Sequence, residues 1–510
     1  MKKIVTIAPI TSTLRLLAIL LICLVSVEAA NNDSPIVVLI PGDAASMLEA
    51  QFDKPTTPHV YCAKSTHGQW QTVWTPPRSQ FVPGRIDCWT DTLTLRVVAN
   101  RNETNTTNTT NTRNPMTTYS IENGPGINIR AVQGEAGLQL KDGNQVDNVY
   151  AALLDFLKHE LGATVHVATY DFRWSPAGNP QFVQELRYMI ETAYRNQFQH
   201  QDNDFKHSSS SPTKVTLLSH SLGALWVHYL LTSGAVSSAW KAQYLHAWIP
   251  ISPAYGGAVL DLQQLVSGFD AGISWLSPRD FIRQQRSFES NVWLLPAPQL
   301  YGNEPLVTLY KKKKKPTVTT TSSATTSSTV STRKMKQEKR TKSLLRHRRR
   351  QPNVPYDSLS YEIDTIYSAL NYSQLFIDSG YDLYPVYDQR ISHLTRWNAT
   401  DDDFDTDPKT PLFQLQDPQV PVWPIYGGNQ STVAGYQYYG SLNSSTPELI
   451  YTTEGDGTVP QRSLTAGNGW SQAQRSCQIM GAGHNAILSH PDAFRRVQTV
   501  LSSSSSITLA

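Results

Sequence analysis

The stretch KVTLLSHSLGALWVHYLL, Lys214 to Leu231, joins a run of strand-forming residues to an apolar run typical of a helix. The turn between them is Ser-His-Ser-Leu-Gly, with Ser221 at its tip. A sharp strand-to-helix turn strains the backbone of such a serine and exposes its hydroxyl, as a nucleophile requires. Serine and glycine are also ordinary turn residues, so the motif alone does not choose between the two interpretations.

Apolar strands and amphipathic helices alternate on both sides of this turn. Strands are expected within residues 34–45, 164–176 and 245–252, and helices within residues 145–163 and 179–198. Continuously apolar strands that alternate with helices predict a mostly parallel central sheet covered on both faces. The predicted fold class is therefore α/β.

The 510 residues suffice for one large domain with insertions or for two to three domains, and 39% apolar residues suit a globular protein. The net charge of +3 is unevenly spread, because much of the positive charge lies in Lys311–Arg350. This basic Ser/Thr-rich insert is expected to be a disordered, solvated segment, with contact to anionic lipid headgroups or cleavage after Arg350 as alternatives. Asn100–Asn114 is expected to be a glycosylated surface loop. Nucleic acid is not an expected partner.

The first 29 residues are typical of a signal peptide. Lys2 and Lys3 precede an apolar run of 12 residues, Leu16–Val27, which as a helix would span only about 18 Å. A retained signal anchor is the alternative. Export agrees with the sequons for N-glycosylation, at Asn32, Asn102, Asn105, Asn108, Asn371, Asn398, Asn429 and Asn443.

Export also bears on the cysteines that remain after cleavage of the signal peptide. In an oxidising compartment Cys62 and Cys88 are expected to form a local pair, which leaves Cys477 as an odd thiol.

A nucleophilic serine needs a base and an acid that orients the base. In LIYTTEGDGTVP, Leu449–Pro460, Asp456 follows an apolar strand between two glycines, and in CQIMGAGHNAILSHPD, Cys477–Asp492, His484 lies in a glycine-rich loop. The order Ser, Asp, His is that of α/β-hydrolases. The alternative for Asp456 is an ordinary Asp-Gly turn.

Two other histidines compete for the role of base. His490 precedes Pro491 and is expected to begin a helix, whereas His220 is expected to pack under the turn. An oxyanion would be bound by the backbone N–H of Leu222, after the serine, and by that of Asp43, after the first strand. The alternative at Asp43 is a simple Pro-Gly turn.

Several motifs in a fixed order extend this pattern along the chain. From Ile36 to Leu488 these are VVLIPGDAASMLEA, CWTDTLTL, YDFRWSP, SHSLG, ISPAYGGA, EGDGTVP and GHNAIL. In this series the chain resembles the lecithin:cholesterol acyltransferase family, which includes lysosomal phospholipase A2. The resemblance implies an α/β-hydrolase fold with Ser221 as nucleophile, Asp456 as acid and His484 as base. It also implies an oxyanion hole of Asp43 and Leu222, with no metal or cofactor.

The chain departs from the family pattern at a few positions. Ser219 stands where glycine is usual, and Phe172 replaces the commoner tryptophan next to Asp171 and Arg173, which we interpret as a structural pair. The family's second disulfide lacks a partner, because Gly467 lies about where that cysteine is expected.

The resemblance also implies a division of the chain. A disulfide-closed lid, about residues 62–88, would bring Trp70 and Trp74 to a lipid surface, with core packing as the alternative for both rings. Residues 30–255 and 416–510 would form the hydrolase core, and residues 256–415 a cap that shapes the acyl pocket.

The implied activity is transfer of a fatty acyl group from a phospholipid, through an acyl-serine, to water or to a lipid alcohol such as a sterol or ceramide. The implied partners are a phospholipid membrane or lipoprotein surface and the lipid donor and acceptor. The expected location is the secretory pathway, either secreted or lysosomal/vacuolar. Two alternatives stay open, namely an esterase or lipase on another lipid ester and a catalytically inactive lipid-binding relative.

Overall fold

The computed structural model describes residues 34–503, apart from 77, 83, 101–117, 143–144, 198–211, 271–274, 314–359, 395–414 and 444–445. The predicted signal peptide therefore lies outside the described residues. So do nearly all of the Asn/Thr-rich loop and, beyond its first three lysines, the basic insert.

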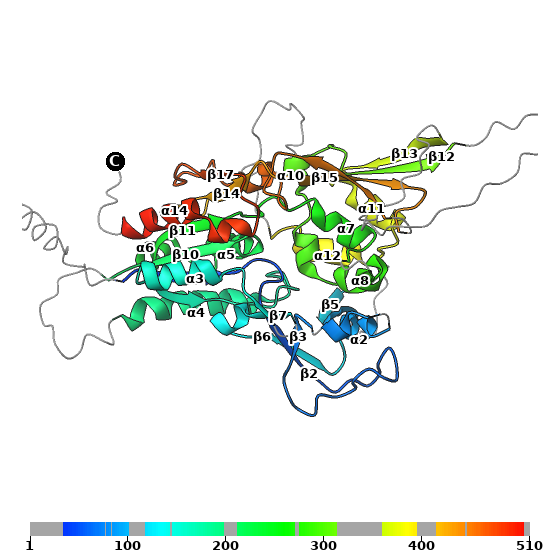
Figure 1. Ribbon diagram of the computed structural model, residues 1–510, viewed down its shortest axis with the longest axis horizontal. Coiled ribbons are helices and arrows are strands. Elements are labelled where there is room, and N and C mark those ends of the chain that lie inside the picture. The colour runs from blue at the N-terminus through cyan, green and yellow to red at the C-terminus, as the bar shows by residue number, and fades with distance from the viewer. Residues whose placement is uncertain are drawn as a thin grey trace, which may run out of the picture.

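A six-stranded sheet forms the centre of the molecule (Figure 1). Every neighbouring pair of its strands is parallel, which confirms the predicted α/β fold. The strand order is β17 (Cys477–Met480), β14 (Ile425–Gly428), β11 (Leu245–Ile251), β10 (Val215–His220), β1 (Ile36–Ile40) and β9 (Thr164–Val167).

Strand β1 separates two hydrophobic cores. Ile36, Val38 and Ile40 pack on one face of the sheet, while Val37 and Leu39 pack on the other. All five side chains are buried, and each contributes about 1.5–3 kcal/mol relative to exposure. The first face is covered by α4 (Pro180–Asn196), α5 (Leu222–Thr232) and α6 (Ser238–Tyr244), and the second by α3 (Ala151–Asp155) and α14 (Pro491–Ser502).

The helix expected over residues 145–163 is shorter than predicted. Its first residues form a short hairpin instead, in which β8 (Gln145–Asp147) pairs with β7 (Leu140–Asp142). Helix α3 follows and continues as a π-helical turn, Phe156–Glu160. Gly162, at a φ of +63°, lies just past the end of this turn, where its lack of a side chain permits the left-handed conformation.

A region that contains the expected lid loop of about residues 62–88 extends from one end of this core, and we call this whole region the lid. Its main elements are an antiparallel sheet of β3 (Gln71–Trp74), β2 (Leu48–Phe52) and β6 (Ile127–Ala131), helix α2 (Ile86–Leu93), and a hairpin of β4 (Leu95–Asn100) and β5 (Thr118–Asn123). The Cys62–Cys88 disulfide joins the β2–β3 loop to α2, which confirms the predicted pairing. Cys477 is free.

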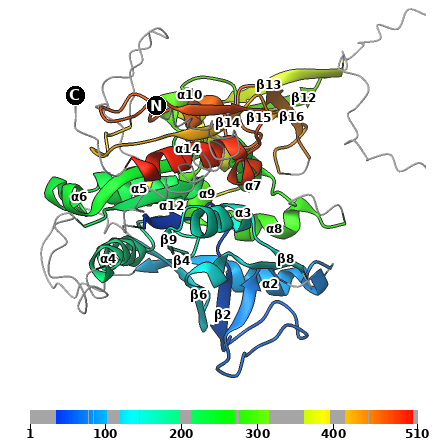
Figure 2. The same cartoon turned by 60° about the vertical axis from the view of Figure 1, so that its left-hand side comes forward.

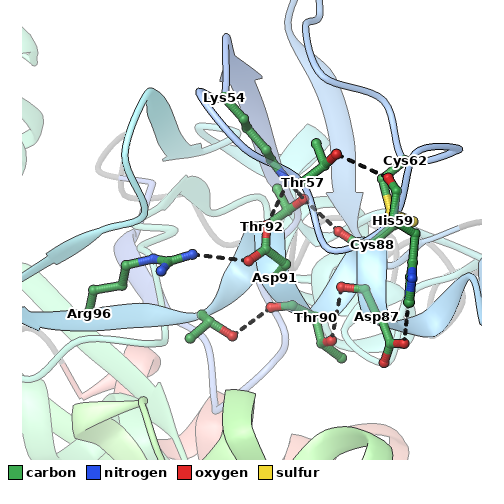
Figure 3. A network of polar contacts seen from close by, with 11 residues as sticks. Lys54, Thr57, His59, Cys62, Asp87, Cys88, Thr90, Asp91, Thr92 and Arg96 are labelled. Atoms are coloured by element: carbon green, nitrogen blue, oxygen red, sulfur yellow. Dashed lines mark hydrogen bonds and ion pairs between the residues drawn. A yellow bond between two sulfur atoms is a disulfide. The ribbon is translucent and has the colours of Figure 1, made fainter.

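Polar contacts within the lid link the chain after β2 to α2 and β4 (Figure 3). The buried Lys54 ammonium lies 3.2 Å from Asp91 and donates to the Thr92 hydroxyl at 2.7 Å. Arg96 binds the other carboxylate oxygen of Asp91 at 3.0 Å. Each buried charge therefore has a partner of opposite sign, as its removal from water requires.

The region that we call the cap combines short helices with a second sheet, and this sheet includes strands past residue 415. Its strands are β13 (Tyr361–Tyr367), β12 (Val307–Lys312), β15 (Thr432–Tyr439) and β16 (Glu448–Thr452). In both overall views the β12–β13 hairpin lies near the top and strand β2 of the lid near the bottom (Figures 1 and 2). The helices are α7 (Leu260–Val266), α8 (Pro278–Gln285), α9 (Glu289–Trp293), α10 (Pro298–Tyr301), α11 (Tyr372–Asp378) and α12 (Tyr384–Ile391).

Buried ion pairs hold the lid and cap to the core through the YDFRWSP turn. Arg173 is fully buried, pairs with Asp171, and donates to the carbonyl of Leu93 in the lid. The fully buried Glu289 of the cap accepts from the Ser175 hydroxyl at 2.6 Å and from Arg390 at 2.9 Å. Asp171 and Arg173 thus form the structural pair that we expected.

Candidate active site

Ser221 lies at the tip of the turn between β10 and α5. Its backbone angles are φ +53° and ψ −123°, a conformation that costs a residue with a side chain roughly 1–3 kcal/mol. Its N–H donates to the carbonyl of Ile251 at 3.1 Å, and its carbonyl accepts from Ala224 at 3.0 Å. Neighbouring strand and helix therefore hold the strained turn in place.

The residues two positions from Ser221 on either side are small for different reasons. A Cβ on Gly223 would lie 2.5 Å from the carbonyl oxygens of Ile40 and Pro41, so only glycine fits there. Ser219 is fully buried, and its hydroxyl accepts a hydrogen bond from the Trp248 indole at 2.8 Å. The departure from the usual glycine is thus accommodated, because the extra hydroxyl has a partner.

Asp456 and His484 form a buried pair, with 2.7 Å between the Asp456 Oδ2 and the His484 Nδ1. The other carboxylate oxygen accepts from the N–H groups of Thr458 and Val459. Burial by itself raises the pKa of Asp456, but the His484 imidazole and these N–H groups outweigh it and hold that pKa below its ordinary value. Asp456 is therefore ionised, and it leaves the Nε2 of His484 free for chemistry.

The turn and this pair come together through His220, the residue before Ser221. The rings of His220 and His484 lie 4.9 Å apart, and the Nε2 of His220 lies 3.1 Å from the carbonyl oxygen of His484. His220 is buried under the turn, as expected, and His490 begins α14 as its N-cap. The structure therefore brings Ser221, Asp456 and His484, which are far apart in sequence, to one edge of the sheet.

The loop after β1 passes against the serine. A Cβ on Gly42 would lie only 3.0 Å from the Cβ of Ser221. In the described part of the chain the backbone N–H groups of Asp43 and Leu222 donate to no other group. Neither N–H therefore has a competing partner there, as the expected role of an oxyanion donor requires.

The side chain of Asp43 lies in an unusual environment. Its Oδ1 is buried without a hydrogen-bond partner among the described residues. Burial raises the pKa of Asp43 to about 7, although a hydrogen bond from Ala44 opposes the shift.

The two tryptophans expected in the lid have different surroundings. The Trp70 ring is half-buried and lies 4.1 Å from the Arg130 guanidinium. The Trp74 indole donates to the carbonyl of Ala44 at 2.6 Å and packs against Phe172. Trp74 therefore joins the lid to the loop that carries Asp43.

Sequence reasoning missed the most exposed apolar residues of the lid, Val60 and Tyr61. They follow His59, whose Nε2 lies 2.8 Å from Asp87 (Figure 3). A lone Val-Tyr pair between polar residues has no periodicity that marks it in sequence.

No group of three or more His, Cys, Asp and Glu side chains is placed to hold a metal ion within the described residues. Among the helices described, none combines the length and hydrophobicity needed to cross a bilayer.

The family model described as "Lecithin:cholesterol acyltransferase" matches residues 70–492. The mouse protein "Lysosomal phospholipase A and acyltransferase" is 29% identical over 292 residues, which cover 56% of this chain and 62% of the relative. Its human counterpart is 30% identical over 288 residues, which cover 55% of this chain and 61% of the human protein. The chicken "Phosphatidylcholine-sterol acyltransferase" is 29% identical over 272 residues, which cover 52% of this chain and 57% of the chicken protein.

The chain thus spans about three fifths of the length of the curated relatives it matches. A solved structure described as "The crystal structure of Tle4-Tli4 complex" aligns with 93% of this chain at 12% identity, but its TM-score of 0.47 is too low to support an inference. The family match, in contrast, covers more than four fifths of the chain. The chain belongs to the lecithin:cholesterol acyltransferase family.

Proposed function

We propose that this chain is a serine-dependent acyl-ester hydrolase and O-acyltransferase that acts on phospholipids. The observation that carries the proposal is the strained Ser221 turn beside the buried Asp456–His484 pair. This combination of nucleophile, base and orienting acid performs acyl transfer on unrelated folds.

In the first half-reaction the Oγ of Ser221 attacks the ester carbonyl of the phospholipid, and the Nε2 of His484 takes the serine proton. Asp456 stabilises the imidazolium that forms, while the N–H groups of Asp43 and Leu222 bind the oxyanion. Loss of one such donor costs about 3–4 kcal/mol in comparable enzymes. The tetrahedral intermediate then collapses, the C–O bond to the lysophospholipid breaks, and His484 returns the proton to the leaving oxygen.

The second half-reaction repeats these steps in reverse. Water or a lipid alcohol gives its proton to His484 and attacks the acyl-serine carbonyl. The Ser221 oxygen leaves with the proton from His484, and the product is a fatty acid or an acylated alcohol. No redox partner is needed, because no atom in these steps changes oxidation state.

The substrate class rests on the relatives, whose names include phospholipase A, acyltransferase and phosphatidylcholine-sterol acyltransferase. A lipid surface, either a membrane or a lipoprotein, is the proposed partner, and the lid with its exposed Val60 and Tyr61 is the proposed contact. The export signal and sequons in the sequence support a secreted or lysosomal location, as does the disulfide.

A vesicle assay tests the proposal. The full chain is incubated with phosphatidylcholine vesicles, with or without a sterol or ceramide. Acylated alcohol in the products indicates transfer, and fatty acid alone indicates hydrolysis. Turnover of a neutral lipid ester but not of phosphatidylcholine would favour the esterase alternative.

A fluorophosphonate probe tests the nucleophile separately. It should label Ser221 in the wild-type chain and leave the Ser221→Ala variant unlabelled. Absence of label on the folded wild-type chain would favour the inactive, lipid-binding alternative.

A further inference from the structure

A buried chain of hydrogen bonds runs beneath Ser221 and joins three loops of the site. The N–H of Gly42 donates to the hydroxyl oxygen of Tyr150 at 2.8 Å. The same oxygen lies 2.9 Å from the Nδ1 of His220, and the Nε2 of His220 lies 3.1 Å from the carbonyl oxygen of His484. Tyr150 is 1% exposed and His220 is 3% exposed, so water does not compete for these bonds.

The donor and acceptor roles of these groups allow one arrangement of protons along the hydrogen bonds. The carbonyl of His484 can only accept, so the neutral His220 ring carries its proton on Nε2 and donates it there. The Nδ1 of His220 then accepts from the Tyr150 hydroxyl, whose oxygen accepts in turn from the N–H of Gly42. Burial lowers the pKa of His220 to about 3, with a further contribution from the nearby His484, so the ring is neutral.

Each end of this series of hydrogen bonds contacts a group that the proposed reaction uses. At one end the N–H of Gly42 is committed to Tyr150, which leaves the next N–H, that of Asp43, for the oxyanion. At the other end the carbonyl of His484 accepts from His220, while its N–H donates to the carbonyl of Asp456 at 2.8 Å. The backbone of the base is therefore held from both sides.

The neutrality of His220 also matters for the base. The two imidazole rings are 4.9 Å apart, and His484 becomes cationic during each half-reaction. A second positive charge at this distance would disfavour the imidazolium. The groups that face His220 are Tyr150, His484 and Asp456, and the first of them donates to the nitrogen that would otherwise take a proton.

We propose that Tyr150 and His220 are positioning residues for acyl transfer. They hold the loop that carries Asp43 and the loop that carries His484 in fixed positions relative to Ser221. This inference rests on the proposed function of Ser221, His484 and Asp456. It assigns a role to a tyrosine that lies just before helix α3, as its N-cap residue, and that a hydrolase motif does not include.

The first test is Tyr150→Phe, which removes one hydroxyl and leaves the aromatic packing on His220. We expect kcat on phosphatidylcholine vesicles to fall by about 10- to 100-fold, because small displacements of reacting groups have effects of this size. KM should stay within about twofold, since the hydroxyl does not face the substrate. The rate of fluorophosphonate labelling at Ser221 should fall in parallel with kcat.

The pH profile separates positioning from a change in the protonation of His220. Burial keeps the His220 ring neutral in Tyr150→Phe as in wild type. The kcat deficit of the variant should therefore be constant over the pH range in which both proteins are folded. A deficit that grows toward acid pH would show that the hydroxyl acts on the charge of His220, which would contradict the positioning role.

Two further variants keep the test decisive if Tyr150→Phe folds poorly. His220→Gln retains an amide that can donate to the His484 carbonyl and cannot titrate, so it should be labelled about tenfold faster than His220→Leu. Tyr426→Phe is the matched control, since it removes a buried hydroxyl that bonds to Ser476, just before β17, and its kcat should stay within twofold of wild type.

The outcomes separate this inference from the proposed function. If wild-type Ser221 is not labelled, the proposed function fails and this inference with it. If wild type is labelled, and both Tyr150→Phe and His220→Leu are labelled at the same rate, the positioning role is overturned while the nucleophile stands.

Discussion

Around Ser221 the side chains of Asp456 and His220 are buried and hydrogen-bonded to backbone groups, whereas at the tip of the lid polar side chains lie at the surface. Asp456 is fully buried and accepts two backbone N–H bonds, and His220 links loops that are hundreds of residues apart. In the lid tip, residues 55–70, His59 pairs with Asp87 while both remain partly exposed, and Val60 is fully exposed.

This difference indicates which part is fixed and which can adapt. Buried, fully paired polar groups favour one arrangement, because any other arrangement leaves a group unpaired. An exposed loop makes few such contacts, and here a disulfide limits its freedom instead. The site around Ser221 is therefore built for fixed geometry, and the lid tip for contact with a variable surface.

The largest expected effect comes from Ser221→Gly, which should abolish acyl transfer, as loss of a serine nucleophile does by about 10⁶-fold elsewhere. Glycine adopts a φ of +53° without strain, so the free energy of unfolding should rise by about 1 kcal/mol. Vesicle turnover and urea unfolding measure the two effects. Ser221→Ala is the control, which should lose the activity without the gain in stability.

Asp456→Asn should slow Ser221 labelling by about 10⁴-fold, as the equivalent change does in serine proteases. The asparagine oxygen can still accept from Thr458 and Val459, so the loop should remain folded. Its amide would donate to the Nδ1 of His484, which moves the imidazole proton to Nε2 and blocks the base. Labelling at the wild-type rate, in a variant with the wild-type circular dichroism spectrum, would rule out the acid role of Asp456.

Much of this site follows from the sequence because Ser221 comes directly after the buried strand β10, while Asp43 follows β1 and His484 follows β17 by a few residues. Such strands end at the same edge of the sheet, so the residues after them lie close together. The fold could be predicted for the same reason, since continuous apolar strands alternate with helices along the chain.

The supporting contacts could not be predicted, because they depend on how distant elements pack. Tyr150 lies beside apolar residues at helical spacing, so its hydrogen bonds to Gly42 and His220 leave no mark in the sequence. The bond from Trp248 to Ser219 depends on the register of two strands 29 residues apart. The contact of Trp74 with the oxyanion loop likewise depends on how the lid folds back.

Asp43 should make the free energy of unfolding depend on pH. We expect this effect to be smaller than the losses of activity described above. Its pKa is raised by burial to about 7 in the folded chain, so the folded state holds a proton that the unfolded state releases near pH 4. The part of the free energy of unfolding that this proton contributes is therefore fully present below about pH 4. It is lost as the pH rises through about 7, and the loss is at most about 4 kcal/mol.

Urea unfolding between pH 4 and 8 checks this expectation. Asp43→Asn should show a shallower fall in stability over this range, since the amide does not titrate. Some fall should remain, because burial also raises the pKa of Asp261, in helix α7. Equal pH dependence in the two proteins would show that Asp43 is ionised without penalty in the folded chain.

The lid disulfide should have the smallest effect on activity, and that effect should depend on the substrate. Removing the Cys62–Cys88 bridge, which closes a separation of 26 residues, should lower the free energy of unfolding by about 3 kcal/mol. Turnover of phosphatidylcholine vesicles should fall, whereas hydrolysis of a soluble short-chain ester should stay within about twofold, since the contacts around Ser221 do not include the bridge. Cys477→Ser is the matched control, because that thiol is free. An equal loss on both substrates would show that the lid tip helps to order the site itself, and the contrast between a fixed centre and an adaptable lid would then be wrong.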